Sequence, residues 1–172
     1  MRTNRGGSSR SSQPTPEQIT ISFTPLSGKS LQVIQGAREK WATFITKYEA
    51  SELTGAAQAA AVVEGFTNAH WSEKPKPEDL APALGAAIGD ILKAQGSVDW
   101  VLAEGTTICL VSPNGKVAVA PVAIATKWLS SRKNPLDKLG GEVAQAVRDT
   151  TGEPVLIGFD DEEDESGDIE LR

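Results

Sequence analysis

The stretch VDWVLAEGTTICLVSPNGKVAVA, residues 98–120, determines the fold expected for this chain. It holds three short apolar runs, at residues 98–103, 106–111 and 116–120. Two turn signals separate these runs, Glu104-Gly105 and Asn114-Gly115. An Asn-Gly pair between apolar runs is a strong signal for a tight hairpin. These residues therefore predict an antiparallel three-stranded meander, which Pro121 ends.

Helical periodicity dominates the residues before the meander. Apolar side chains recur at steps of three and four over residues 31–48, and Ser30 is the expected cap. An alanine-rich run follows Ser51, which is the expected cap of a second helix. Residues 77–96 begin with proline and two acids and then carry leucine and isoleucine on one face. The pattern predicts three successive helices.

Strand and helix signals at the two ends complete the expected order. Ile19, Ile21 and Phe23 alternate with polar residues, which predicts a strand that Pro25 closes. Beyond the meander, residues 124–129 fit a short helix or turn, residues 136–150 predict a last helix, and residues 155–159 fit one more strand. We therefore predict an α+β fold with an N-terminal strand, three helices, an antiparallel three-stranded meander and a C-terminal helix, between disordered tails.

Charge divides the 172-residue chain into three parts. Residues 1–17 are predicted to be a disordered basic arm, because residues 1–16 hold three arginines and no acid among serine, glycine and proline. Residues 18–159 are predicted to be a single α+β domain. Residues 160–172 are predicted to be a disordered acidic tail, because eight acids stand there against one arginine.

The composition excludes several classes of protein. Hydrophobic residues make up 39% of the chain, which fits a packed core and excludes collagen and fully disordered chains. Cys109 is the single cysteine, so no internal disulfide can form. The longest apolar stretch, residues 117–125, is far below the about 20 residues of a membrane span. We expect a cytoplasmic protein that binds neither membranes nor nucleic acid directly.

One short motif fits the place of a phosphate-binding loop. Gly28-Lys29-Ser30 follows the predicted first strand and opens a predicted helix. A complete loop needs a glycine five positions before Gly28, where this chain has Phe23. We therefore expect Gly28 to serve a turn and Ser30 to cap the helix, with no nucleotide and no other cofactor.

The few chemistry-bearing side chains do not form a motif. His70 is the only histidine, and Cys109 is the only other soft metal donor, so a zinc site lacks ligands. Cys109 lies in an apolar run, which favours a buried thiol over a nucleophile paired with His70. Trp100 and Trp128 are large aromatics typical of a core or rim. These four residues define one candidate pocket, between the meander and the helix over residues 77–96.

Two glycines, Gly85 and Gly89, lie on one face of that same predicted helix. Each costs about 1 kcal/mol relative to alanine in a helix interior. We therefore expect that face to pack closely against the sheet.

The acidic run is the strongest candidate for contact with a partner. It comprises Asp160, Asp161, Glu162, Glu163, Asp164 and Glu165. One interpretation is a solubilising tail, because like charges keep such a run extended. The other is a polyanion that binds a basic surface on a partner protein. The sequence leaves both open.

Residues 80–147 resemble a known family. Leu84-Gly85, Gly89, Asp99-Trp100-Val101, Pro121 and Lys127 occur there in that order. This order resembles a small uncharacterised bacterial domain family, domain of unknown function thirty-eight hundred and six. The resemblance implies a bacterial source and a fold segment, and it implies no activity for any residue.

The scarcity of catalytic side chains favours a non-catalytic protein. We expect a cytoplasmic bacterial interaction protein, an adaptor or an immunity-type inhibitor, which binds a protein partner, with a basic partner favoured through the acidic tail. One alternative is a small-ligand-binding protein or enzyme that uses the candidate pocket. Another is a structural subunit of a larger bacterial assembly. The sequence does not determine the oligomeric state.

Overall fold

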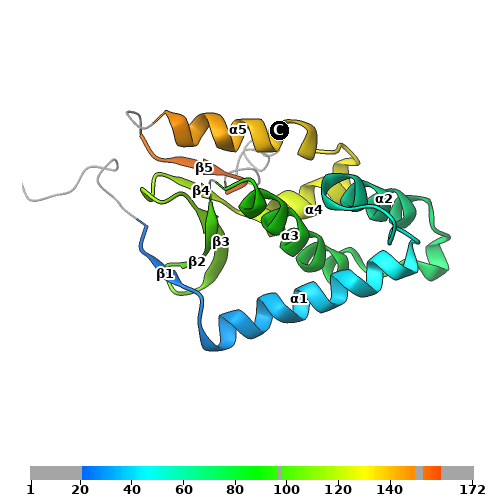
Figure 1. Ribbon diagram of the computed structural model, residues 1–172. Coiled ribbons are helices and arrows are strands. Elements are labelled where there is room, and N and C mark those ends of the chain that lie inside the picture. Colours follow the sequence, from blue (N-terminus) through cyan, green and yellow to red (C-terminus); the bar gives the residue numbers. More distant parts are fainter. Residues whose placement is uncertain (1–20, 97, 150–152, 160–172) are drawn as a thin grey trace, which may run out of the picture.

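The computed structural model describes residues 21–96, 98–149 and 153–159, and these form an α+β fold (Figure 1). The predicted basic arm and acidic tail lie outside these residues. The described elements, in chain order, are β1 (Phe23–Pro25), α1 (Gly28–Lys47), α2 (Gly55–Asn68), the 3-10 turn η2 (Trp71–Glu73), α3 (Pro77–Ala94), β2 (Asp99–Ala103), β3 (Thr107–Val111), β4 (Val117–Val119), α4 (Pro121–Ser131), α5 (Leu136–Arg148) and β5 (Val155–Ile157).

The sheet has five strands in the order β1-β2-β3-β4-β5. The pairs β1–β2, β2–β3 and β3–β4 are antiparallel, which confirms the predicted meander of β2, β3 and β4. β5 lies parallel to β4, so the sheet is mixed. In this register Trp100, Leu110 and Val119 stand side by side across three strands. Side chains alternate along a strand, so Cys109 points to the opposite face.

The two hairpin turns differ from each other in type. Glu104 and Gly105 both have a positive φ, at 53° and 72°, which is the backbone of a tight type I′ turn. At the second turn only Gly115 has a positive φ, and its amide donates to the carbonyl of Ser112 at 2.9 Å. This is the pattern of a longer loop with a bulge. Both predicted turns exist, but Asn-Gly marks the longer one.

Helix α3 lies at the centre of the hydrophobic core. In Figure 1 it runs between the sheet and α2, with α1 along one side and α5 near β5. Gly89 packs directly under the indole of Trp100 from β2. A Cβ atom on Gly85 would lie 2.8 Å from the Cα of Val122 in α4. The close packing expected of these glycines is thus confirmed against the sheet for Gly89, while Gly85 packs against a helix instead.

The predicted order of elements was incomplete. It gave one helix and one strand fewer than the structure has, although the helix or turn expected over residues 124–129 is found as α4 and the strand expected over residues 155–159 as β5. Pro121 does end the meander, but it also begins α4, because proline at the first helical position needs no amide partner. β5 adds a parallel strand that the meander pattern cannot indicate.

Three local boundaries were also wrong. The first strand, expected over residues 19–24, is Phe23–Pro25, so the described residues Ile21 and Ser22 precede it. Pro25 pairs with Val101, because an edge strand tolerates proline. Residues 19 and 20 lie outside the described residues. The helix caps are Ser27 and Thr54, in place of Ser30 and Ser51.

Candidate functional site

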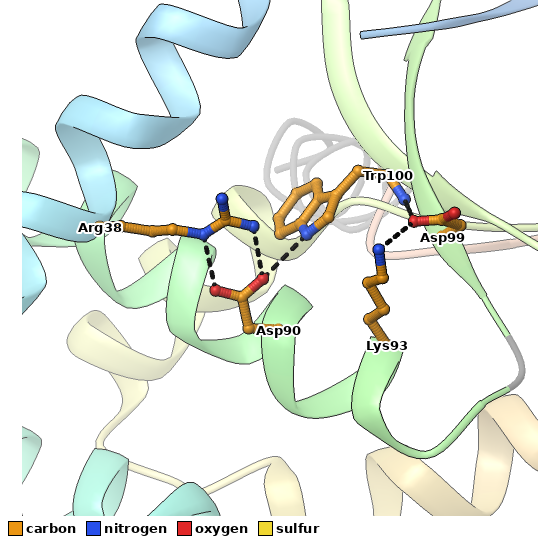
Figure 2. Close-up of polar contacts among 5 residues, drawn as sticks. All are labelled: Arg38, Asp90, Lys93, Asp99 and Trp100. Carbon is orange, nitrogen blue, oxygen red and sulfur yellow. Dashed lines mark hydrogen bonds and ion pairs between the residues drawn. The ribbon is translucent and has the colours of Figure 1, made fainter.

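Trp100 belongs to a polar and aromatic clamp that joins α1, α3 and β2 (Figure 2). Its indole nitrogen donates to Asp90 Oδ1 at 2.9 Å. Arg38 donates to both oxygens of the same carboxylate, at 2.9 Å from Nε and 2.8 Å from Nη2. Gly89 packs against the six-membered ring of the same indole, so a backbone contact and a hydrogen bond together hold the side chain. At this position, therefore, Trp100 itself fills the space between the meander and α3 where the sequence suggested a pocket.

A second ion pair fixes the start of β2. Lys93 Nζ lies 2.9 Å from Asp99 Oδ1, which also accepts the backbone amide of Trp100 at 2.8 Å. These contacts, first the lysine and then the amide, lower the pKa of Asp99. Both side chains are largely exposed, so the pair contributes little to stability.

The structure does not bring Cys109 into a reactive setting. Its side chain is fully buried on the sheet face opposite Trp100. Burial raises the pKa of the thiol to about 11. Because the thiolate is the nucleophile, a thiol that stays protonated at neutral pH is poorly suited to catalysis.

His70 lies away from the sheet, exposed at the end of α2. Its Nδ1 is 2.8 Å from Ser72 Oγ, and its ring lies beside the indole of Trp71 at a centroid distance of 5.7 Å. Trp71 is 80% exposed. Of the four residues of the predicted pocket, then, His70 is on the surface and Trp100 and Cys109 occupy opposite faces of the sheet.

The fourth residue, Trp128, lines a groove of about 490 Å³ between α4, α5 and the end of β5. We call it the α4–α5 groove. The apolar part of its lining comes from three elements: Ile124 and Trp128 of α4, Leu139 of α5, and Ile157 with Gly158 at β5. This volume lies within the range of ordinary ligand and peptide pockets.

The chain builds this groove by a tight turn between α4 and α5. Arg132 ends α4 in a left-handed conformation, φ 63°, and its amide donates to the carbonyl of Trp128 at 2.7 Å. Asn134 Oδ1 then accepts the amide of Leu136 at 2.8 Å, which starts α5. The turn thus places the apolar side chains of α4 beside Leu139.

Gly158 closes the groove at the end of β5. Its φ is 90°, and a Cβ atom there would lie 3.0 Å from the carbonyl oxygen of Ala120 and 3.0 Å from Ile124 Cγ1. Glycine therefore lets the backbone after β5 approach α4 closely.

Charged side chains surround the apolar floor. Three lysines line the groove, Lys127, Lys133 and Lys138, and two acids, Asp137 and Glu142. Arg132 lies in the turn beside Lys133, and the chain has no acid between residues 127 and 136. Both acids belong to α5, so the α4 side and the turn are cationic while the α5 side is mixed.

The described part of the chain ends one residue after this groove. Gly158 lines it, Phe159 is the next residue, and Asp160 to Glu165 follow. These six acids lie outside the described residues.

Only part of the groove was accessible to sequence reasoning. Trp128 is one of the four residues of the predicted pocket, and residues 124–129 were expected to form a short helix or turn. Leu139 belongs to the helix that was predicted over residues 136–150, and it is buried on the apolar face of α5. Nothing in the pattern indicated that β5 would bring Ile157 next to α4.

The other candidate sites have structural roles or are absent. Ser30 Oγ accepts the amide of Ser27 at 2.9 Å and donates to its carbonyl at 2.8 Å, so it is committed to the start of α1. Across residues 21–96, 98–149 and 153–159, no group of three or more His, Cys, Asp or Glu side chains could hold a metal ion. No helix in the same residues is both long and apolar enough to cross a bilayer.

No family model, no curated protein and no solved structure matches this chain. The resemblance of residues 80–147 to a bacterial domain family therefore stays a prediction.

Proposed function

We propose that this protein is a non-catalytic cytoplasmic interaction protein, and that it binds an acidic segment with apolar anchors from a protein partner in the α4–α5 groove. The observation that carries the proposal is the lining of the groove, which combines the apolar side chains of Ile124, Trp128 and Leu139, called here the apolar floor, with three lysines. Interaction proteins commonly take an apolar side chain into such a hollow and surround it with polar contacts.

The two parts of the groove have different physical roles. Burial of one leucine-sized anchor contributes about 1.5–3 kcal/mol. Lysine contacts at an exposed rim contribute less to affinity, but they speed the encounter with an anion and disfavour a basic partner. Asp137 and Glu142 repel carboxylates, so they direct an acidic segment towards α4 and the turn.

This proposal moves the binding face from the acidic tail to the folded body. The sequence favoured a basic partner held by Asp160 to Glu165, whereas the groove favours an acidic one. The two interpretations predict opposite partner charge, which makes them separable in one experiment.

The test is a random peptide display on full-length chains. One bait is the native chain, and the second is a neutral-segment variant with the substitutions Asp160→Asn, Asp161→Asn, Glu162→Gln, Glu163→Gln, Asp164→Asn and Glu165→Gln. The neutral-segment variant cannot capture basic peptides through the acidic run, because the run carries no charge there. We expect this variant to enrich peptides that combine Asp or Glu with leucine, isoleucine or phenylalanine.

Matched charge variants locate the binding. In the neutral-segment background, Lys133→Glu with Lys138→Glu should abolish the enrichment, because both lysines line the groove. Lys29→Glu with Lys40→Glu changes the net charge equally at two exposed sites on α1 and should retain it. The proposal is overturned by enrichment of basic peptides on the native chain alone, by no enrichment at all, or by equal loss in both charge variants.

A further inference from the structure

We infer that residues 160–172 of this chain occupy its own α4–α5 groove and compete there with the partner. The inference rests on the proposed function, because it assigns a regulator to the same site. Three independent features support it: the position where the segment leaves the fold, its charge and its apolar residues.

The segment starts at the wall of the groove. Gly158 is part of the lining, and Asp160 is two residues further along the chain. An extended chain advances about 3.3 Å per residue, so Asp160 to Glu165 cannot move more than about 25 Å from Gly158. The first acids therefore stay within reach of the groove in any conformation.

The charges of the segment and of the groove are complementary. Residues 160–172 carry eight acids and one arginine, a net charge of −7. The cationic groups in the lining are Lys127, Lys133 and Lys138, and Arg132 precedes Lys133 in the turn. The acids are tethered close to these cations and have the opposite charge, and both features favour contact between the segment and the groove at low salt.

The segment also supplies apolar anchors. Ile169 and Leu171 are its only aliphatic residues, and they are two positions apart. In an extended chain, residues two apart lie on the same side. Both side chains can therefore face the floor of Ile124, Trp128 and Leu139 together.

Tethering makes even a weak contact effective. A short flexible connection gives an effective concentration of the order of millimolar. Suppose that the free peptide binds with a dissociation constant about tenfold below this effective concentration. The tethered segment would then occupy the groove in most molecules, and a competitor would bind with an apparent affinity about tenfold weaker.

The first test locates the segment in the intact chain. Asp168→Cys carries a nitroxide label, because Cys109 is buried and its raised pKa keeps it unreactive. We expect paramagnetic broadening of the amides of Lys133 and Lys138 at low salt and its loss at high salt. Lys133→Glu with Lys138→Glu should remove the broadening, and Lys29→Glu with Lys40→Glu should leave it. Broadening confined to other surfaces, or equal in both charge variants, overturns the inference.

The second test measures competition. The probe is the fluorescein-labelled peptide DDEEDESGDIELR, which has the sequence of residues 160–172, and binding is followed by anisotropy. We expect the neutral-segment variant to bind it about tenfold more tightly than the native chain. A charge-matched control neutralises six exposed acids away from the groove: Glu39, Glu49, Glu52, Glu73 and Glu78 become glutamine, and Asp79 becomes asparagine. This control should bind like the native chain.

The outcomes separate the inference from the proposed function. Tighter binding by the neutral-segment variant alone supports self-occupancy. Equal tightening in the control shows an effect of net charge only and overturns the inference, as does equal affinity in all three chains. No binding of this peptide to any chain also overturns it, while the peptide display decides the function separately.

Discussion

Substitution of Gly89 by alanine tests the packing that fixes Trp100. A methyl group at this position would overlap the indole ring, which is only 9% exposed and is held by Asp90. Overpacking of a core costs about 1–3 kcal/mol. Displacement of the indole also breaks a hydrogen bond to a charged group, worth about 1.5–3 kcal/mol. The helix gains about 1 kcal/mol from alanine. We expect a net loss of about 1.5–5 kcal/mol in the free energy of unfolding.

Gly36→Ala is the matched control for this experiment. Gly36 also lies inside a helix, and nothing stands within 4 Å of the position of its Cβ. The same chemical change there should raise the free energy of unfolding by about 1 kcal/mol. Urea denaturation followed by far-UV circular dichroism measures both variants. If Gly89→Ala is as stable as Gly36→Ala, the close contact between α3 and Trp100 is wrong.

Three further substitutions test local features of the fold. Burial raises the pKa of Cys109 to about 11. The free energy of unfolding should therefore fall by about 2–3 kcal/mol as the pH rises from about 9 to about 11. Urea titrations of the wild type and of Cys109→Ala over this pH range measure the loss as the difference between the two proteins. Tyr48 Oη is buried without a hydrogen-bond partner in the described part of the chain. Tyr48→Phe should therefore stabilise the protein by about 1 kcal/mol. An unchanged or lower midpoint of urea unfolding contradicts this expectation. Arg132→Gly relieves a left-handed backbone and should raise the free energy of unfolding by about 1 kcal/mol; a lower melting temperature in calorimetry would show that the side chain stabilises the turn.

Local sequence signals predicted the elements that depend on local physics. The periodicity over residues 77–96 indicated α3, because one apolar face is enough to define an amphipathic helix. The meander followed from two glycine-containing turns between apolar runs. The Asn114-Gly115 loop shows the limit of such signals, because Asn114 Oδ1 accepts hydrogen bonds from Ser112 Oγ and from the backbone amide of Lys116, which favours the longer turn.

Long-range pairing accounts for what the sequence did not show. β5 joins the sheet beside β4 after two intervening helices, and no pattern within Val155–Ile157 specifies its neighbour. The candidate pocket had the same weakness, since it grouped side chains by type before their faces were known. Trp100 and Cys109 belong to neighbouring strands, yet alternation places them on opposite faces of the sheet. The α4–α5 groove depends on both Leu139 and Ile157, which only the tertiary fold brings near Trp128.

The most direct test of the binding site is chemical-shift mapping of the full-length neutral-segment variant with the peptide DDEEDESGDIELR. We predict that the shifted amides cluster at residues 124–128, 133–139 and 157–158, around the apolar floor and the lysines. Shifts that cluster instead around the exposed Trp71, or that spread evenly over the surface, would contradict the assignment of the α4–α5 groove as the site that takes acidic segments.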